Sequence, residues 1–204
     1  MKIAIIGTGN VGGALATRWS ISGHQIYFGV RDIHNFKGKS LLDNPNTYVL
    51  SISEAVEKAE IIVIAAIPQA ITDIVKLMGN VNGKIIIDAM NSVSSKPEGY
   101  LNTFDALLDL AKGAEIVKCF NSTGFENMLN PVYERHGIDM FMAGNSEEAK
   151  KIVRQLALDA GFAECYDFGG NNKAELLEKF ALSWINLAIM QGYGRNIAFK
   201  LIKR

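Results

Sequence analysis

A glycine pattern at residues 7–12 constrains the fold of this chain more than any other feature of its sequence. Four consecutive apolar residues, 3–6, lead directly into the run GTGNVG, and helical spacing begins after it. In such a strand–turn–helix unit, the first glycine permits a sharp turn, the second lets a pyrophosphate approach the backbone, and the third allows the helix to pack closely on the strand. The phosphates would lie on the unpaired N–H groups of the helix N-terminus. We therefore predict a dinucleotide-binding turn rather than a glycine turn without a ligand, formed by Gly7, Thr8, Gly9, Asn10, Val11 and Gly12.

Apolar segments and helical segments alternate along the chain, which predicts an α/β fold. Strands are expected at residues 3–6, 24–30, 47–50, 60–67, 83–91, 114–121, 138–143 and 163–168. Helices are expected at residues 13–19, 54–59, 69–78, 104–111 and 146–160, and either Ser51 or Ser53 would cap the second of them. Several of the strands are continuously apolar, as in a parallel sheet that is covered on both faces. The pattern favours a Rossmann-like, doubly wound, mostly parallel sheet.

The length of 204 residues fits one domain of moderate size. We expect a single NAD(P)-binding Rossmann-like domain over residues 1–204, with residues 173–204 as a long C-terminal helical extension packed on it. Gly192 and Gly194 would kink or interrupt that helix. The apolar stripe of this segment, which includes Trp184, could form a homodimer interface or could cover the sheet, and the sequence leaves both open.

Charge and composition exclude some classes of partner. Lys and Arg together number 21, as do Asp and Glu, and this balance argues against a nucleic-acid or anionic-membrane partner. The longest apolar run, residues 61–68, is much shorter than the roughly 20 residues of a membrane helix, and we find no signal-peptide pattern. Cys119 and Cys165 lie far apart outside any CxxC motif, as is typical of reduced thiols. We expect a cytoplasmic protein.

The end of the second expected strand indicates which dinucleotide is bound. An NAD site places a carboxylate at this strand tip to bind the ribose 2′-hydroxyl. Here the strand ends in Gly29-Val30-Arg31, and Lys37 follows shortly after. A small residue leaves room for a 2′-phosphate, and a guanidinium binds phosphate through paired hydrogen bonds. The sequence thus favours NADP(H) bound by Arg31 and Lys37, with Asp32, beyond the tip, as a loop carboxylate or an ion-pair partner of Arg31.

The remaining candidates lie where other strands end, because ligands of open α/β sheets bind at the carboxyl ends of the strands. These candidates are Ile67 and Pro68, Met90 and Asn91, and Asn121 and Ser122. No His, Lys, Glu or Cys with an adjacent base lies at these tips, so we assign no catalytic acid, base or nucleophile. We also find no metal-ligand spacing and propose no metal site. Neutral amides beside a dinucleotide suit direct hydride transfer between two bound cofactors, which depends on orientation and exclusion of water.

The chain resembles the NADPH-dependent reductases of the deazaflavin coenzyme F-420, a group that includes the NADPH-binding domain of the STEAP metalloreductases. The resemblance covers essentially the whole chain, and its motifs lie at residues 5–12, 28–31, 66–68, 117–122 and 192–199. It implies a pyrophosphate at residues 8–11, the 2′-phosphate at Arg31 and the adenosine at Ile67-Pro68. It also implies that nicotinamide meets a flavin-type ring at Asn121-Ser122. The family often has Gly-Ser-Arg where this chain has Gly29-Val30-Arg31, so one hydroxyl contact to the phosphate is missing.

On this basis we expect an NADPH-dependent oxidoreductase that transfers hydride to or from a second cofactor, either F-420 or FMN or FAD. Family members are often dimeric, and the C-terminal helix would form the homodimer contact. One alternative is a small-substrate reductase of the β-hydroxyacid or imine-reducing type, but the hydroxyacid enzymes use a Lys with an Asn four residues on, and here Ser183 follows Lys179 at that distance. Another is a non-catalytic NADPH-binding sensor, which would equally lack an acid or base.

Overall fold

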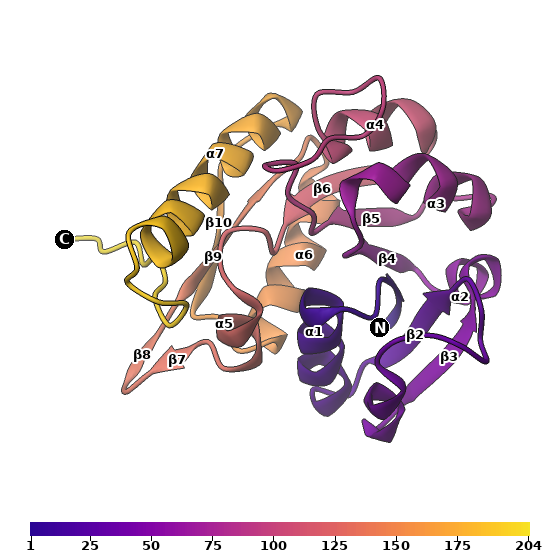
Figure 1. Cartoon of the computed structure of the whole chain (residues 1–204), viewed down its shortest axis with the longest axis horizontal. Helices are drawn as coiled ribbons and strands as arrows, with labels where there is room; N and C mark the ends of the chain where they lie inside the picture. The colour runs from indigo at the N-terminus through magenta and orange to yellow at the C-terminus, as the bar shows by residue number, and fades with distance from the viewer.

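The computed structural model describes all 204 residues and is organised around one eight-stranded sheet with the order β10-β9-β6-β5-β4-β1-β2-β3 (Figure 1). The strands of this sheet are β1 (Lys2–Ile6), β2 (Gln25–Val30), β3 (Thr47–Ser51), β4 (Ile61–Ile64), β5 (Ile85–Asp88), β6 (Glu115–Cys119), β9 (Asp139–Ala143) and β10 (Glu164–Asp167). The helices are α1 (Asn10–Ile21), α2 (Ile52–Lys58), α3 (Ile71–Met78), α4 (Thr103–Leu110), α5 (Phe125–Leu129), α6 (Glu147–Asp159) and α7 (Ala174–Ile185). The predicted doubly wound, mostly parallel α/β architecture is confirmed.

The strand order determines where a ligand site can form. Strand β1 pairs in parallel with both β2 and β4, so the order reverses between β1 and β4. The parallel strands β1 to β6 all end at the same edge of the sheet, and the loops that follow them meet there. Strand β9 is antiparallel to β6, and β10 is parallel to β9, so these two strands end at the opposite edge. A ligand at the reversal point is therefore bound by the loops after β1, β2, β4, β5 and β6.

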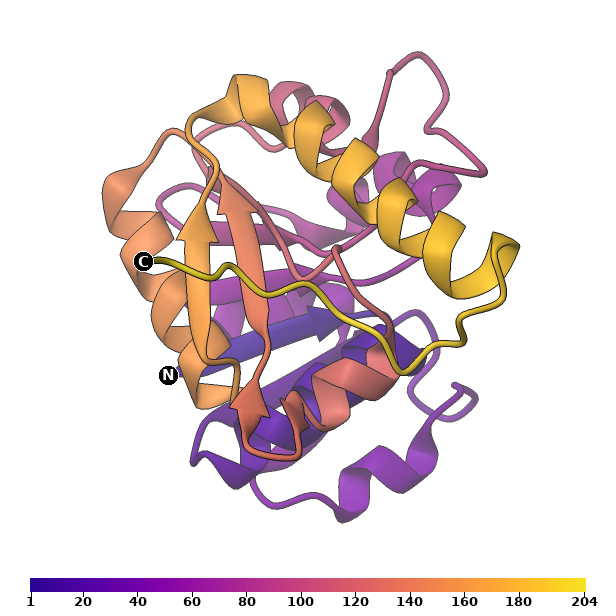
Figure 2. The same cartoon turned by 90° about the vertical axis from the view of Figure 1, so that its left-hand side faces the viewer.

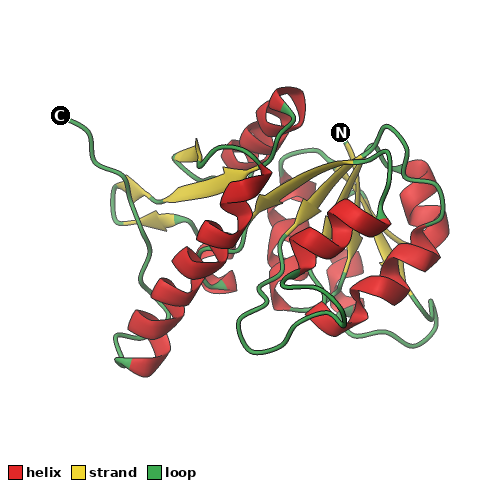
Figure 3. Cartoon of the chain, turned by 90° about the horizontal axis from the view of Figure 1, so that it is seen from above, coloured by secondary structure: helices red, strands yellow, loops and turns green.

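Helices cover both faces of the sheet (Figure 3). On one face, Ile5 of β1 packs in the core with Trp19 of α1 and residues of α6. On the other, Ile6 packs with α2, α3 and α4, and Leu177 of α7 packs against Phe141 of β9. Burial on both faces explains the continuously apolar strands. None of the helices combines the length and apolar character needed to cross a membrane.

Side-chain caps fix the starts of two helices. The Ser51 hydroxyl accepts the N–H of Glu54, and the Glu54 carboxylate accepts the N–H of Ser51, so Ser51 rather than Ser53 caps α2. Ser146 caps α6 in the same way by accepting the N–H of Ala149. The helix starts expected from these serines are therefore confirmed.

The structure differs from the sequence prediction in its last third. Residues 125–137, for which the sequence predicts no element, form α5 and a short hairpin of β7 (Val132–Tyr133) and β8 (His136–Gly137). The prediction of a helical extension to Arg204 is wrong beyond Met190. Helix α7 continues only through a π-helical turn, Asn186–Met190, and the left-handed backbone of Gly192 (φ +75°) and Gly194 (φ +83°) then turns the chain.

The segment beyond Gly194 returns as an extended tail across β9 and β10 (Figure 2). The carbonyl oxygen of Ile197 accepts hydrogen bonds from Trp184 Nε1 and Asn127 Nδ2, each at 2.7 Å. The ring of Phe199 packs 4.4 Å from that of Phe180, centroid to centroid. Trp184 is only 4% exposed. The apolar stripe of α7 therefore covers the protein's own sheet and tail.

Candidate functional site

Two glycines of the turn after β1 are required by the packing of the protein itself. Gly7 has a φ of +119°, and a Cβ atom there would lie 2.2 Å from the carbonyl oxygen of Ala65 at the end of β4. A Cβ atom at Gly12 would lie 1.9 Å from the carbonyl oxygen of Gly7. Both distances are far below van der Waals contact and involve backbone atoms that have little freedom to move. These glycines let α1 pack closely against β1 and β4.

Gly9 has no such packing reason. It precedes the first residue of α1 with an extended backbone, and a Cβ atom there would have no neighbour within 4 Å. The N–H groups of Asn10, Val11 and Gly12, in the first turn of the helix, have no intrahelical partner. No side chain caps them either. Gly9 and Asn10 are both exposed. The turn therefore presents open space and free N–H groups at the positive end of a helix, which is an arrangement that suits an anion.

The loop after β2 carries positive charge to the same turn. Arg31 and Lys37 are exposed, and neither forms an ion pair within the protein. Gly38, with φ +81°, brings this loop so close to Thr8 that a Cβ atom would lie 2.9 Å from the Thr8 carbonyl oxygen. Two cationic side chains without partners thus lie on a loop that contacts the glycine turn.

Asp32 is a loop carboxylate. Its Oδ1 accepts the backbone N–H groups of His34 (2.9 Å) and Asn35 (3.2 Å), and it forms no ion pair with Arg31. Gly29, two residues before Arg31, lets α2 approach β2, since a Cβ atom there would lie 3.2 Å from Cα of Ile52. The tip of β2 therefore places no carboxylate where an NAD ribose would need one.

Ile67 and Pro68 follow β4 beside the glycine turn. Pro68 is buried and begins a short 3-10 helix, Pro68–Ala70, whereas the side chain of Ile67 is 66% exposed. Ala65, two residues earlier, is the residue that Gly7 approaches. Ile67 thus offers an apolar surface next to the turn.

Asn91 and Asn121 bond to each other across the ends of β5 and β6. Nδ2 of Asn91 donates to the carbonyl oxygen of Asn121 at 2.8 Å, and Nδ2 of Asn121 donates to Oδ1 of Asn91 at 3.0 Å and to the carbonyl oxygen of Leu177 at 3.2 Å. Asn121 is 3% exposed, and its Oδ1 is the one buried side-chain nitrogen or oxygen atom without a hydrogen-bond partner. Phe120, just before it, has a φ of +60°, which is uncommon for a residue with a bulky side chain. A strained backbone thus precedes an unpartnered buried acceptor, which is a combination found at binding sites.

Met90 and Ser122, the other two candidates at these strand ends, are buried. Met90 is 3% exposed, and its N–H donates to Oδ1 of Asp88. Ser122 is 2% exposed, and its hydroxyl donates to the sulfur of Met140 at 3.5 Å. Both residues are about as buried as Asn121, but only Asn121 has an acceptor atom without a partner, and Asn91 beside it is partly exposed.

A buried ionic network that local sequence patterns do not reveal binds the residues on either side of Asn91. Nζ of Lys118, on β6, donates to Oδ2 of Asp88 (3.0 Å), Oε1 of Glu178 (2.6 Å) and the carbonyl oxygen of Met90 (2.6 Å). The side chains of Lys118 and Asp88 are fully buried, and that of Glu178 is 11% exposed. Asp88 also accepts the hydroxyl of Thr103 at 2.7 Å. The strand carboxylate Asp88 is therefore part of a charged network that joins β5, β6, α4 and α7.

The charge state of this network follows from its hydrogen bonds. Every group that faces the two carboxylates is a donor, so both are ionised, and with one ammonium the network carries a net charge of −1. Burial lowers the pKa of Lys118, but Asp88 and Glu178 together raise it more, and the pKa lies above its usual value. A lysine in an apolar strand signals a buried partner. The partner itself, Glu178, is 60 residues away and has no local signature.

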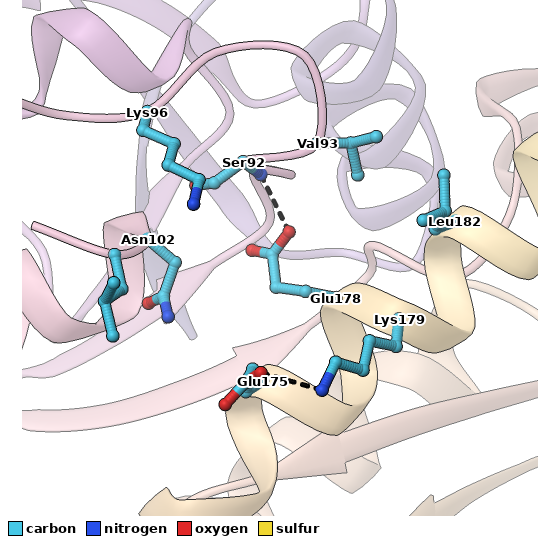
Figure 4. Close-up of a pocket in the computed structure, with 9 residues that line it drawn as sticks. Ser92, Val93, Lys96, Asn102, Glu175, Glu178, Lys179 and Leu182 are labelled. Atoms are coloured by element: carbon cyan, nitrogen blue, oxygen red, sulfur yellow. Dashed lines mark hydrogen bonds and ion pairs between the residues drawn. The ribbon is translucent and has the colours of Figure 1, made fainter.

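A pocket of about 250 Å³ opens beside the network, between the loop after β5 and helix α7 (Figure 4). Its lining residues are Ser92, Val93, Lys96, Leu101, Asn102, Glu175, Glu178, Lys179 and Leu182. In Figure 4, Glu178 reaches from α7 to the backbone of Ser92, whose N–H donates to Oε2 at 2.7 Å. No group of three or more His, Cys, Asp or Glu side chains is placed to hold a metal ion.

Comparison with known sequences supports the resemblance that the motifs indicate. Residues 2–92 match the family described as NADP oxidoreductase, coenzyme F-420-dependent. The F-420-dependent NADP reductase of Methanothermobacter thermautotrophicus is 25% identical over 209 residues, covering 93% of this chain and 90% of that protein. Metalloreductase STEAP3 of Rattus norvegicus is 27% identical over 184 residues, covering 89% of this chain and 36% of that longer protein. The resemblance to the F-420 reductases and the STEAP metalloreductases is confirmed.

Solved structures share the fold. A candidate F-420-dependent NADP reductase from Arthrobacter sp. FB24 superposes over the full length of both chains with a TM-score of 0.87 at 24% identity. A reductive aminase from Aspergillus terreus, in complex with NADPH and ethyl levulinate, has a TM-score of 0.71 at 19% identity, covering 94% of this chain and 62% of the aminase. At these identities the likeness shows the fold alone.

Proposed function

We propose that this relative of the F-420-dependent NADP reductases is an NADP(H)-dependent oxidoreductase that passes hydride directly between the nicotinamide ring and a bound deazaflavin or flavin. The observation that carries the proposal is Gly9. Its backbone faces open space at the N-terminus of α1, although no neighbouring atom of the protein requires a glycine there. A pyrophosphate close to the backbone supplies that reason.

The rest of the dinucleotide follows the ends of the strands. Arg31 and Lys37 bind the 2′-phosphate, because they are exposed cations without ion-pair partners on the loop that contacts the turn, and Arg31 lies at the tip of β2. The exposed side chain of Ile67, followed by Pro68, lies against the adenosine. At the other end, Asn121, whose Oδ1 has no partner in the protein, would accept a hydrogen bond from the nicotinamide carboxamide. These residues therefore offer a suitable contact to each part of NADP(H), from the 2′-phosphate to the nicotinamide.

The chemistry requires orientation rather than proton transfer. When bound, NADPH supplies the hydride, and a deazaflavin or flavin ring accepts it. The Asn91–Asn121 pair orients the nicotinamide carboxamide. Holding two flat rings face to face is a proximity effect that needs no acid or base.

Anaerobic oxidation of NADPH by the purified protein tests the proposal. We expect loss of the NADPH absorbance band with one acceptor from a panel of F-420, FMN, FAD and riboflavin, and little reaction with NADH. That acceptor is then the second cofactor. NADPH that binds without being oxidised by any acceptor would favour a sensor. A cyclic imine is tested as an additional substrate, and turnover with it alone would favour the small-substrate reductases. A protein that does not bind NADPH contradicts the proposal altogether.

Replacement of Arg31 by Ala is expected to weaken NADPH binding about 10- to 100-fold, because it removes charge-assisted hydrogen bonds to the 2′-phosphate. Binding of NADH, which lacks this phosphate, is expected to stay the same. Titration calorimetry with both nucleotides checks the difference. Arg135→Ala, in the exposed turn between β7 and β8, is the matched control and should bind NADPH like the unmodified protein. Equal loss of both nucleotides in Arg31→Ala would contradict the assignment.

We also propose that two copies of the chain pair through the end of the α7 segment. Trp184 is buried and unavailable, but Ile189 (51%), Met190 (68%) and Tyr193 (71%) expose apolar surface together. Analytical ultracentrifugation is expected to show a dimer that an Ile189→Lys, Met190→Lys double variant converts to a folded monomer. A monomeric unmodified protein at micromolar concentration, with or without NADPH, would exclude this contact.

A further inference from the structure

Two charged side chains hold the two ends of one short turn. Residues 90–92 follow β5, and Asn91 lies in the middle of them. Before Asn91, the carbonyl oxygen of Met90 accepts from Nζ of Lys118 at 2.6 Å. After it, the N–H of Ser92 donates to Oε2 of Glu178 at 2.7 Å. Both backbone groups flanking Asn91 are thus bound to one buried ion pair, in which Lys118 and Glu178 are 2.6 Å apart.

We propose that the Asp88–Lys118–Glu178 network is a positioning device for the nicotinamide end of the site. It fixes the turn so that Asn91 holds the amide of Asn121, whose Oδ1 stays free for the ligand. None of the three charged groups would touch the reacting rings, and each acts through the turn. This inference rests on the proposed function, because it takes nicotinamide as the partner of Asn121.

The network can hold the turn rigidly because every hydrogen-bond donor in it has an acceptor. All three hydrogens of the Lys118 ammonium have acceptors. The hydroxyl of Ser92 accepts the N–H of Thr103, at the start of α4, at 3.1 Å. The turn is therefore tied to β6, α7 and α4 at once. Buried networks in which every group is satisfied specify one conformation.

The net charge of the network also affects the relative affinities for oxidised and reduced nucleotide. Oxidised nicotinamide carries a positive charge, whereas the reduced ring is neutral. A charge of −1 next to Asn91, in a poorly solvated region, therefore favours NADP⁺ over NADPH. A residue that merely supports the fold would have no influence on this preference.

The test compares Glu178→Gln with Glu175→Gln, a matched control one turn earlier on α7 whose side chain is exposed and pairs with exposed Lys179. Dissociation constants are measured for adenosine 2′,5′-bisphosphate, NADPH and NADP⁺. In Glu178→Gln we expect the bisphosphate to bind as before, NADPH to bind about tenfold more weakly, and NADP⁺ to lose about threefold more than NADPH. The control should bind all three ligands like the unmodified protein.

Two results would overturn the inference: equal losses for all three ligands, or unchanged binding of NADPH and NADP⁺ in a folded Glu178→Gln. If that variant does not fold, the combination Asp88→Asn, Lys118→Met, Glu178→Leu replaces all three charges by neutral groups, a change that buried ion networks often tolerate. It should still bind the bisphosphate but bind NADPH weakly, and normal NADPH binding would again refute the inference. Failure of the proposed function is distinguishable, because it would appear in the unmodified protein, which would then not bind NADPH or would bind it without oxidation by any acceptor.

Discussion

Alanine at Gly12 is expected to destabilise the protein by about 3 kcal/mol or more, whereas alanine at Gly9 should leave the fold intact and weaken NADPH binding. The Cβ atom at Gly12 would lie 1.9 Å from a backbone oxygen, so α1 would have to move away from β1. The Cβ atom at Gly9 meets no protein atom, and its φ of −79° suits alanine. Alanine at these two positions therefore separates the packing role of glycine from its role in nucleotide binding.

Urea denaturation and NADPH titration of both variants check this separation. For Gly9→Ala we expect a change in stability of no more than about 1 kcal/mol, since glycine is preferred to alanine before a helix, and a rise of at least about tenfold in the dissociation constant for NADPH. Gly79→Ala controls for a glycine with open space away from the site, although its φ of +70° adds a strain cost of its own. A Gly9→Ala protein that binds NADPH normally would refute phosphate binding at this turn.

Replacement of Lys118 by Met is expected to destabilise the protein by about 3–5 kcal/mol at neutral pH, because two carboxylates would remain buried without their cation. Met matches the length of the lysine stem, so the loss reports the charge rather than a cavity. Lys179→Met on α7 is the control, because Lys179 is 68% exposed and pairs only with exposed Glu175. We expect it to change stability by less than about 0.5 kcal/mol. A Lys118→Met protein with the urea midpoint of the unmodified protein would contradict the net charge assigned to the network.

Lys118 also makes the stability of the unmodified protein depend on pH. Burial lowers and the two carboxylates raise the pKa of Lys118, and the net shift is upward. Its stabilising contribution is therefore fully present below the pKa of an unfolded lysine and is lost as the pH rises through the raised pKa. Lys118→Met has no ammonium group at this position, so it should lack this loss of stability at high pH. Urea midpoints of both proteins at pH 7 and at a pH above 10.5, the usual pKa of lysine, measure this difference.

Local patterns predicted most of the sheet correctly because both faces of a parallel strand are buried and the sequence of each strand shows it. The same reasoning failed after Gly194. The apolar residues Ile197, Phe199 and Leu201 resemble a continued helix, but they belong to an extended tail that is held by side chains from elsewhere in the chain. The hairpin of β7 and β8 was missed because each of its strands has only two residues. Such short elements depend on tertiary contacts rather than on local preference.

Candidate site residues could be named from the sequence where one stretch of chain carries them, but not where distant residues meet. The glycine turn and Arg31 were identified as candidates from their spacing after a strand. The network of Lys118 and Glu178 was not, since its partners come from β6 and α7 and have no common motif. The free Oδ1 of Asn121 was equally invisible, because it depends on which acceptors already occupy the amide N–H groups.

The C-terminal tail beyond Gly194 and the sheet differ in local stability. Beyond Gly194 it makes a single backbone-to-backbone hydrogen bond, from the N–H of Asp139 to the carbonyl oxygen of Phe199. Its other anchors involve side chains: contacts to Trp184, Asn127 and Asp139, the Arg195–Glu126 ion pair, and a hydrogen bond from Lys200 to the carbonyl oxygen of Gly137. Segments held in this way open at much lower free energy than a sheet with a continuous ladder. The indole of Trp184 can therefore become exposed by release of the tail alone, while the sheet and the loops at its edge stay folded.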